Sequence, residues 1–131
     1  MKRLFIVIGV SLAILVATIT VLYGWIGHGV KKNIEIAQSK YPGDAEDALI
    51  SYLQDQTNSP RDRTHIAIWT LGQIDSKKAL PILHELYKND PKGKTCLNHH
   101  DSLLCQYEIH KAINSIEKWK PMGYGYLKSR N

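Results

Sequence analysis

Residues 4–26 read LFIVIGVSLAILVATITVLYGWI, an apolar stretch that decides the architecture of the chain. It holds no charged residue, and as a helix of about 23 residues it is long enough to cross the hydrocarbon core of a bilayer. Tyr23 and Trp25 stand near its end, where aromatic rings favour the headgroup level. The stretch therefore predicts a transmembrane anchor over residues 1–29, closed by a break at Gly27-His28-Gly29.

The basic start, Lys2 and Arg3, would also suit a cleaved signal peptide, which would leave a secreted soluble domain. The apolar region of a signal is shorter and ends in a small-x-small cleavage site, and no convincing site follows here, so the anchor is favoured. Lys31 and Lys32 balance the basic start, so charge alone does not set the orientation. Because few residues precede the span, we expect a single-pass protein whose N-terminus is cytoplasmic and whose C-terminal domain is extracytoplasmic, periplasmic in a bacterium.

Composition limits the rest of the chain to one domain with no nucleic-acid role. The chain has 131 residues, and its 17 Lys and Arg outnumber its 12 Asp and Glu. The basic residues gather at the termini and around the anchor, and no basic stripe with interleaved aromatic residues is present. This distribution is typical of positive flanks beside anionic lipid headgroups, so we expect a membrane and a protein as partners and no nucleic acid.

Residues 30–43 are predicted as a juxtamembrane linker that is helical up to Ser39 and then broken by Pro42-Gly43. Two amphipathic helices are predicted beyond it. Asp44 is suited to cap the first, and Ser59, Pro60 and Asp62 form a start signal for the second. Apolar residues recur three and four apart in both. They are Ala45, Ala48, Leu49, Tyr52 and Leu53 in the first helix and Ala67, Thr70, Leu71 and Ile74 in the second, with Ile66 and Ile68 at the margins of the stripe.

Two more helices are predicted, separated by an insertion at residues 90–101. Pro81 suits the opening turn of the third, where a missing N–H loses no partner. Asp101 or Ser102 is expected to cap the fourth. The stripes contain Ala79, Leu80, Leu83, Leu86 and Tyr87 in the third helix and Cys105, Ile109, Ala112, Ile113, Ile116 and Trp119 in the fourth. The helical domain then spans residues 44–120, followed by an irregular tail at 121–131.

The four helices read as two copies of one helical pair. Ala48-Leu49 corresponds to Ala79-Leu80, and Leu71 and Ile74 correspond to Ile113 and Ile116, with the insertion inside the second copy. Such amphipathic pairs cannot bury their stripes alone and must stack on a neighbour. The pattern therefore predicts an all-α fold in which a transmembrane helix precedes two stacked antiparallel helix pairs.

The segment from Ile66 to Asp90, IAIWTLGQIDSKKALPILHELYKND, resembles the junction of two HEAT-like repeats. The similarity lies in Ala67, Leu71-Gly72, Ile74, Asp75 and Ala79-Leu80-Pro81. It implies a short solenoid that binds other proteins, and it implies neither a catalytic residue nor a cofactor. Two repeats are fewer than such arrays usually need, so we expect a partner, a second copy of the chain in a homodimer, or a covalent staple to support the fold.

Cys96 and Cys105 bracket the one segment with possible metal or redox chemistry. A disulfide between them would pin the insertion to the fourth helix in an oxidising compartment. Zinc is an alternative, held by Cys96, His99, His100 and Cys105, although the usual paired spacings are missing. Two reduced thiols are the third interpretation. The disulfide is the prediction that we carry forward.

A protein-binding face is predicted on the second and fourth helices. It consists of Arg61, His65, Trp69, Tyr107 and Lys111, which lie off the apolar stripes. Exposed Trp, Tyr and Arg side chains are those that anchor interfaces. The alternative is that Trp69 simply packs within the domain.

A hydrolytic enzyme is the competing class. His65, His84 and His110, with Glu85 and Glu108 beside them, could supply an acid and a base. No nucleophile elbow, phosphate loop or H-E-x-x-H frame accompanies these residues. We therefore expect a protein without enzymatic activity.

Overall fold

The computed structural model describes residues 2–99 and 101–118, and every regular element within these ranges is helical. The chain divides into two compact units, Met1–Lys31 and Lys32–Asn131. The predicted all-α class is therefore confirmed for the described residues. Trp119 and the predicted tail at 121–131 lie outside them.

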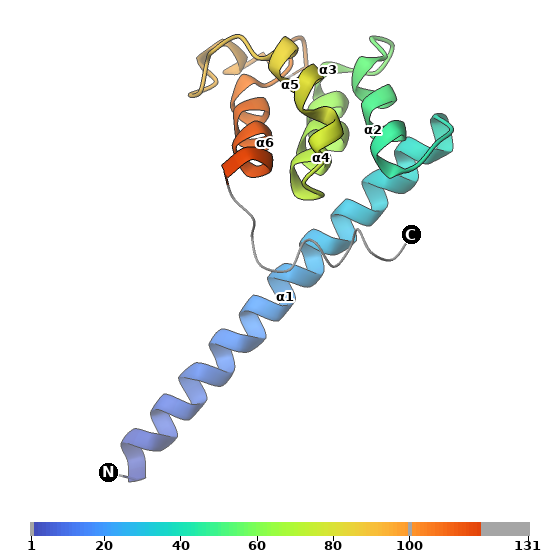
Figure 1. Cartoon of the computed structure of the whole chain (residues 1–131). Coiled ribbons are helices and arrows are strands. Elements are labelled where there is room, and N and C mark those ends of the chain that lie inside the picture. The colour runs from blue at the N-terminus through green and yellow to red at the C-terminus, as the bar shows by residue number, and fades with distance from the viewer. Residues whose placement is uncertain (1, 100, 119–131) are drawn as a thin grey trace. The chain divides into compact units, whose positions relative to one another are not determined.

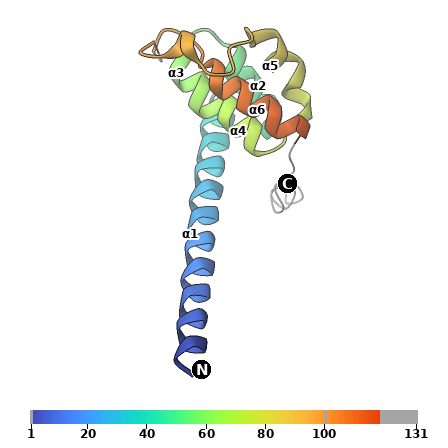
Figure 2. The same ribbon diagram turned by 90° about the vertical axis from the view of Figure 1, so that its left-hand side faces the viewer.

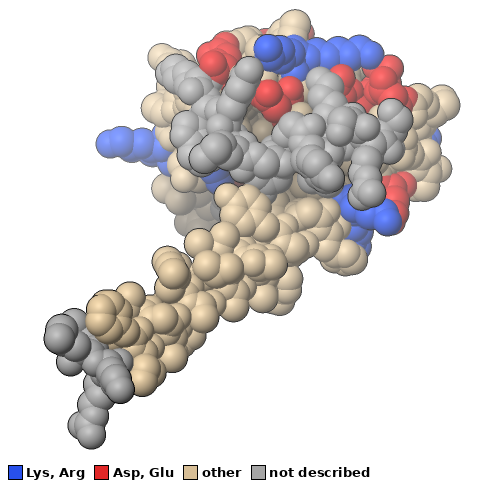
Figure 3. Space-filling view, turned by 60° about the horizontal axis from the view of Figure 1, so that its bottom comes forward, with Lys and Arg blue, Asp and Glu red and all other residues tan. Residues whose placement is uncertain are grey.

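The first unit is formed by most of one long helix, α1, at Lys2–Lys40 (Figure 1). From Phe5 to Trp25 its side chains are exposed, 70% for Phe5 and 79% for Trp25. Figure 3 shows this part of the helix without a charged side chain. The hydroxyls of Thr18 and Thr20 donate to the carbonyls four residues earlier at 2.9 Å, so neither is left without a partner. The helix is long and apolar enough to be a membrane span or a signal helix.

The predicted break at Gly27-His28-Gly29 is wrong, because α1 continues through it to Lys40. Glycine within a helix costs only about 1 kcal/mol relative to alanine, and no proline is present there to interrupt the hydrogen bonds. The break comes instead at Pro42-Gly43, as predicted.

Residues 30–39 are helical, as predicted, but the stretch is not a separate linker. From Lys32 onward they belong to the second unit, and Ala37 is fully buried in its core. The amide of Asn33 donates to the Thr70 hydroxyl at 2.9 Å and to the His65 carbonyl at 3.2 Å. The last turns of α1 are therefore an integral helix of the domain.

The first two predicted helices of the domain are present, with the predicted caps. Helix α2 spans Ala45–Gln54, and the Asp44 carboxylate accepts from the Asp47 N–H at 2.8 Å. Helix α3, Pro60–Asp62, continues as the π-helical segment η1, Arg63–Ile68, and then as α4, Trp69–Gln73. The Ser59 hydroxyl accepts from the Asp62 N–H at 3.1 Å. Ile68, predicted at the margin of the stripe, is fully buried, because the wider π-helical turn changes the angular spacing of the side chains.

The third helix also matches its prediction, but the fourth starts later than expected. A 3₁₀ turn, η2, at Lys77–Ala79 leads into α5 at Leu80–Leu86, with Pro81 in its first turn. A second 3₁₀ turn, η3, at Lys94–Cys96 precedes α6 at Gln106–Lys118.

Neither Asp101 nor Ser102 caps α6. The Ser102 and Leu103 N–H groups both donate to the His99 carbonyl, at 3.1 and 2.9 Å, so the chain is still turning there. The Cys105 N–H donates to the Thr64 hydroxyl at 3.3 Å, so a tertiary contact satisfies this amide just before α6 begins.

The core of the second unit lies where α2, the η1–α4 segment and α6 meet. Figure 2 shows α4 and α6 side by side, and both run in the same direction. Helix α5 packs on α6, and η2 packs on α2. The buried side chains come from every predicted stripe: Ala48, Leu49, Tyr52, Leu53, Ala67, Leu71, Ala79, Leu83, Ile109, Ala112, Ile113 and Ile116.

A polar cluster joins the end of α1 to the end of α2. The buried Asn58 amide donates to the Tyr52 carbonyl at 2.9 Å and the Tyr41 hydroxyl at 3.0 Å, and its oxygen accepts from the Lys40 ammonium at 2.5 Å. Tyr41 in turn donates a short hydrogen bond to Asp55. That bond, with the Thr57 N–H, lowers the pKa of Asp55 to about 2. The cluster thus supports the packing of α1 residues into the domain.

Gly72 sets the spacing between α4 and α6. A Cβ atom placed there would lie 3.0 Å from the Ala112 Cα and 3.1 Å from its Cβ. We expect Gly72→Val to lower the free energy of unfolding by about 1 to 3 kcal/mol, because the added carbons must push the two helices apart. Urea unfolding of the full chain in detergent measures this change.

Gly27→Val is the matched control for that substitution. Gly27 is also a helical glycine, but a Cβ atom placed on it would meet no other atom within 4 Å. The urea concentration at which the Gly27→Val variant is half unfolded should stay near that of the unsubstituted chain. Equal losses of stability in the two variants would contradict the close approach at Gly72.

Candidate functional site

Two neighbouring hollows mark the surface between the α3–η1–α4 segment and α6, and we call their combined lining the α4–α6 groove. The larger hollow measures about 330 Å³ and the smaller about 150 Å³. Glu108 lines both, so the hollows adjoin. The other lining residues are Trp69, Gly72, Gln73, Lys111, Ala112, Asn114 and Ser115 in the larger hollow and Arg61, Thr64, His65, Cys105 and Tyr107 in the smaller.

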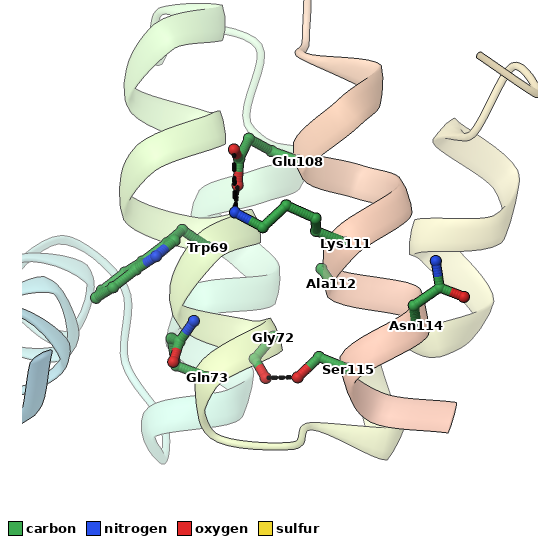
Figure 4. Close-up of a pocket in the computed structure, with 8 residues that line it drawn as sticks. All are labelled: Trp69, Gly72, Gln73, Glu108, Lys111, Ala112, Asn114 and Ser115. Atoms are coloured by element: carbon green, nitrogen blue, oxygen red, sulfur yellow. Dashed lines mark hydrogen bonds and ion pairs between the residues drawn. The ribbon is translucent and has the colours of Figure 1, made fainter. Parts of the chain in front are cut away.

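The larger hollow exists because its lining includes two small residues. Gly72 of α4 faces Ala112 of α6, and neither carries a side chain long enough to fill the space above the contact. The Ser115 hydroxyl donates to the Gly72 carbonyl at 3.2 Å, which ties the two helices together at one end of the hollow (Figure 4). A close backbone contact thus gives the groove a rigid base.

Charges of both signs border the groove. The Lys111 ammonium lies 3.4 Å from a Glu108 carboxylate oxygen and 5.3 Å from the centre of the Tyr107 ring. Arg61 lies 3.8 Å from the Asp101 carboxylate. All these side chains except that of Glu108 are more than a third exposed. Each cation therefore has an acidic neighbour, and the groove is close to electrically balanced.

All five residues of the predicted binding face line this groove. Arg61, His65 and Tyr107 line the smaller hollow, and Trp69 and Lys111 line the larger. Trp69 is half-buried, and Figure 4 shows its ring turned to the side of α4 that faces away from α6. Trp69 therefore borders the groove at its edge, and its ring does not point at Lys111.

Sequence reasoning misses three features of the groove. It places Glu108 only beside a histidine, yet Glu108 joins the two hollows and pairs with Lys111. The small residues Gly72 and Ala112 read as core positions, and only their contact across two helices reveals a hollow. The π-helical segment that carries His65 has no sequence signal, although such segments occur frequently at functional sites.

The two cysteines lie together beneath the smaller hollow. Cys96 and Cys105 are both buried, and their sulfur atoms are 2.7 Å apart. The Cys96 thiol also lies 3.2 Å from the Gly93 carbonyl, to which it donates. Burial, and then the hydrogen bond with Cys96, raises the pKa of Cys105, so its thiol stays protonated at neutral pH.

The described residues form no ligand cluster that would support the alternative of a zinc site. Among residues 2–99 and 101–118, no three His, Cys, Asp or Glu side chains gather as a metal-binding group. His99 is exposed, and His100 lies outside the described residues. Zinc at Cys96, His99, His100 and Cys105 stays a prediction, which metal analysis of the purified protein would test.

The histidines of the enzymatic alternative that lie on α5 and α6 each have a local partner. His84 on α5 contacts the Glu117 carboxylate of α6 at 2.8 Å. His110 contacts the Asn114 amide at 2.8 Å and stacks on Tyr87, with the ring centres 5.6 Å apart. These contacts connect α5 with α6 and give both side chains a role in packing.

Comparison with known proteins gives no relative for this chain. No protein-family model, no curated protein and no solved structure matches it. Its function is therefore inferred from the α4–α6 groove and the exposed apolar helix.

Proposed function

We propose that the chain is a membrane-tethered helical module, without enzymatic activity, that docks a partner protein through the α4–α6 groove. The observation that carries this proposal is the position of five side chains. Arg61, His65, Trp69, Tyr107 and Lys111 come from two helices that are far apart in the sequence, yet all line one groove. Aromatic and arginine side chains around a concave surface are typical of protein interfaces.

The tether is inferred from the exposed apolar part of α1. Large apolar side chains along Phe5 to Trp25 are all at least 44% exposed, with Ile19 the least. Water would disfavour so large an apolar surface, whereas a bilayer accommodates it. We place the domain on the extracytoplasmic side, because an oxidising compartment there would suit a disulfide between the adjacent Cys96 and Cys105 thiols.

A HEAT-like arrangement of the domain is part of the same proposal. Helix α2 packs on the η1–α4 segment, α5 packs on α6, and α4 packs on α6. These contacts suit two helical pairs that stack through their second helices, as the resemblance in Ile66 to Asp90 implies. A stack of only two helical pairs buries less apolar surface between repeats than a longer array does. A docked partner would therefore also stabilise it.

The groove favours a partner segment with an apolar side chain and few net charges. Gly72 and Ala112 offer an apolar base, while Lys111 and Arg61 are already paired with Glu108 and Asp101. A strongly acidic partner would have to displace these carboxylates, and a strongly basic one would meet both cations. We therefore expect a segment of mixed charge whose apolar side chain enters the larger hollow.

Site-specific photo-crosslinking in intact membranes tests the proposed surface. A photoreactive amino acid at Tyr107, which is 46% exposed, should capture the partner. The same amino acid at Glu85, exposed on α5, is the matched control and should not. Crosslinks to a second copy of the chain would show that the partner is another copy and that the protein forms a homodimer. Equal capture at both positions would refute the groove as the docking surface.

Alanine substitution gives the size of the effect. We expect Trp69→Ala combined with Lys111→Ala to weaken partner binding by at least about 30-fold, because two anchor side chains are removed from one interface. Partner retention is measured by co-purification at a fixed amount of membrane protein. Glu85→Ala should leave retention unchanged, and full retention by the Trp69 and Lys111 variant would contradict the proposal.

A further inference from the structure

Residues 97–99 and 101–104, which lie between the two cysteines, belong to a loop at one end of the α4–α6 groove. We propose that Cys96 and Cys105 are an oxidisable dithiol, whose disulfide fixes this loop against the Arg61 end of the groove. The inference concerns the geometry of the groove and stands whether or not a partner docks there. Three structural observations support it: the thiol contact, the attachment of the two ends of the loop, and the position of Asp101.

The two thiols are held together by the fold around them. Cys96 is 2% exposed and Cys105 is 7% exposed, with 2.7 Å between their sulfur atoms. Gly93 allows the chain to pass close to α6, because its φ of 63° favours glycine and an added Cβ would lie 2.8 Å from the Tyr107 Cβ. The same Cβ would lie 3.1 Å from the Cys96 sulfur. Cys96 is therefore pressed against the start of α6, where Cys105 lies.

Both ends of the loop are anchored, whereas its middle is exposed. At one end the Asp90 carboxylate accepts from the Thr95 N–H and hydroxyl, each at 2.8 Å. At the other end the Cys105 N–H donates to Thr64 of η1. Between them Leu97 is 60% exposed and Leu103 is 44% exposed. A covalent bond between the cysteines would join the two anchored ends and restrict the exposed residues.

The loop reaches the groove through Asp101. Its carboxylate lies 3.8 Å from the Arg61 guanidinium, and both side chains are largely exposed. An ion pair this exposed contributes little by itself, so it holds the loop only weakly. With the disulfide formed, Asp101 stays near Arg61, and without it the loop can move away and leave the Arg61 guanidinium without this ion pair. Oxidation would thus set how open this end of the groove is.

The oxidation needs a disulfide donor, and glutathione disulfide is a suitable probe. One cysteine thiolate attacks the donor and forms a mixed disulfide, releasing one glutathione thiolate. The other cysteine thiolate attacks that mixed disulfide, forms the Cys96–Cys105 bond and releases the second glutathione. Two protein thiols are oxidised, one glutathione disulfide is reduced, and the two thiol protons pass to the released glutathione. The burial of both thiols makes this reaction slow unless the loop opens.

Thiol counting in the full chain in detergent micelles tests the dithiol. The chain is treated with glutathione disulfide or with a reductant, then unfolded and alkylated, and its mass is measured. We expect two alkyl groups on the reduced chain and none on the oxidised chain. A parallel sample is oxidised at a low urea concentration, so that the glutathione disulfide can reach the buried thiols. The proposal would be overturned if the chain carried two alkyl groups after both oxidation treatments. It would also be overturned if glutathione remained attached to a cysteine of the chain.

Hydrogen exchange tests whether the bond fixes the loop. We expect exchange in residues 97–99 and 101–104 to slow by about tenfold or more on oxidation. The double variant Cys96→Ser with Cys105→Ser should show no difference between the two treatments. Asp101→Asn should still form the disulfide, because it removes only the ion pair. A disulfide that forms in the unsubstituted chain and leaves exchange unchanged would overturn the fixing of the loop.

Discussion

Replacing both Leu12 and Leu15 with arginine is expected to remove the chain from membranes. The two side chains lie near the middle of the apolar stretch and are 60% and 56% exposed. An arginine at the centre of a membrane helix costs about 3 kcal/mol relative to leucine. Two arginines should therefore shift the equilibrium between the membrane-inserted and the non-inserted chain by about four orders of magnitude. Alkaline extraction of isolated membranes, followed by detection of the chain in pellet and supernatant, measures the change.

Leu97→Arg with Leu103→Arg is the matched control for this experiment. It adds the same charge at two exposed leucines outside α1, so the chain should stay in the pellet. Mass measurement of the mature protein gives the second check, because residues 4–26 must still be attached. A mature chain that is soluble and lacks them would show that the apolar helix is a cleaved signal.

Leu71→Ala is expected to cost the domain about 3 to 5 kcal/mol of stability. Leu71 is fully buried in α4, in the core that α2 and α6 complete. Truncation removes apolar contacts and leaves a cavity that helices on either side cannot easily close. Domains of this size are stable by only about 5 to 15 kcal/mol, so a large share of the stability is lost. Urea unfolding of the full chain in detergent, followed by tryptophan fluorescence, measures the loss.

Leu97→Ala is the control for Leu71→Ala. The Leu97 side chain is 60% exposed, so its truncation should change the free energy of unfolding by less than about 0.5 kcal/mol. If both leucine variants unfolded at the same urea concentration, α4 would not lie at the centre of the core.

The elements that could be predicted from the sequence depend on local rules. Asp44 and Ser59 cap their helices because the side-chain oxygen and the orphan N–H groups lie within three residues of each other. The apolar stripes could be predicted because helical periodicity depends only on spacing, and Leu49 and Leu71 are indeed buried.

What could not be predicted depends on contacts between distant residues. The start of α6 depends on Thr64 accepting from Cys105, and the burial of Ala37 depends on the packing of α1 into the domain. Neither contact leaves a local pattern. For the groove, residue type and helical face are enough to identify the five residues of the predicted binding face, which line it, whereas its depth comes from Gly72 meeting Ala112.

The continuity of α1 has a consequence for any shedding of the domain by a protease. Pro42-Gly43 is the obvious place to cut by sequence, but scission there would strip Asn33 and Ala37 from the helices they pack against. The released fragment would carry an open apolar seam and would be prone to aggregate. Intact release requires cleavage N-terminal to Lys32, where the second unit begins.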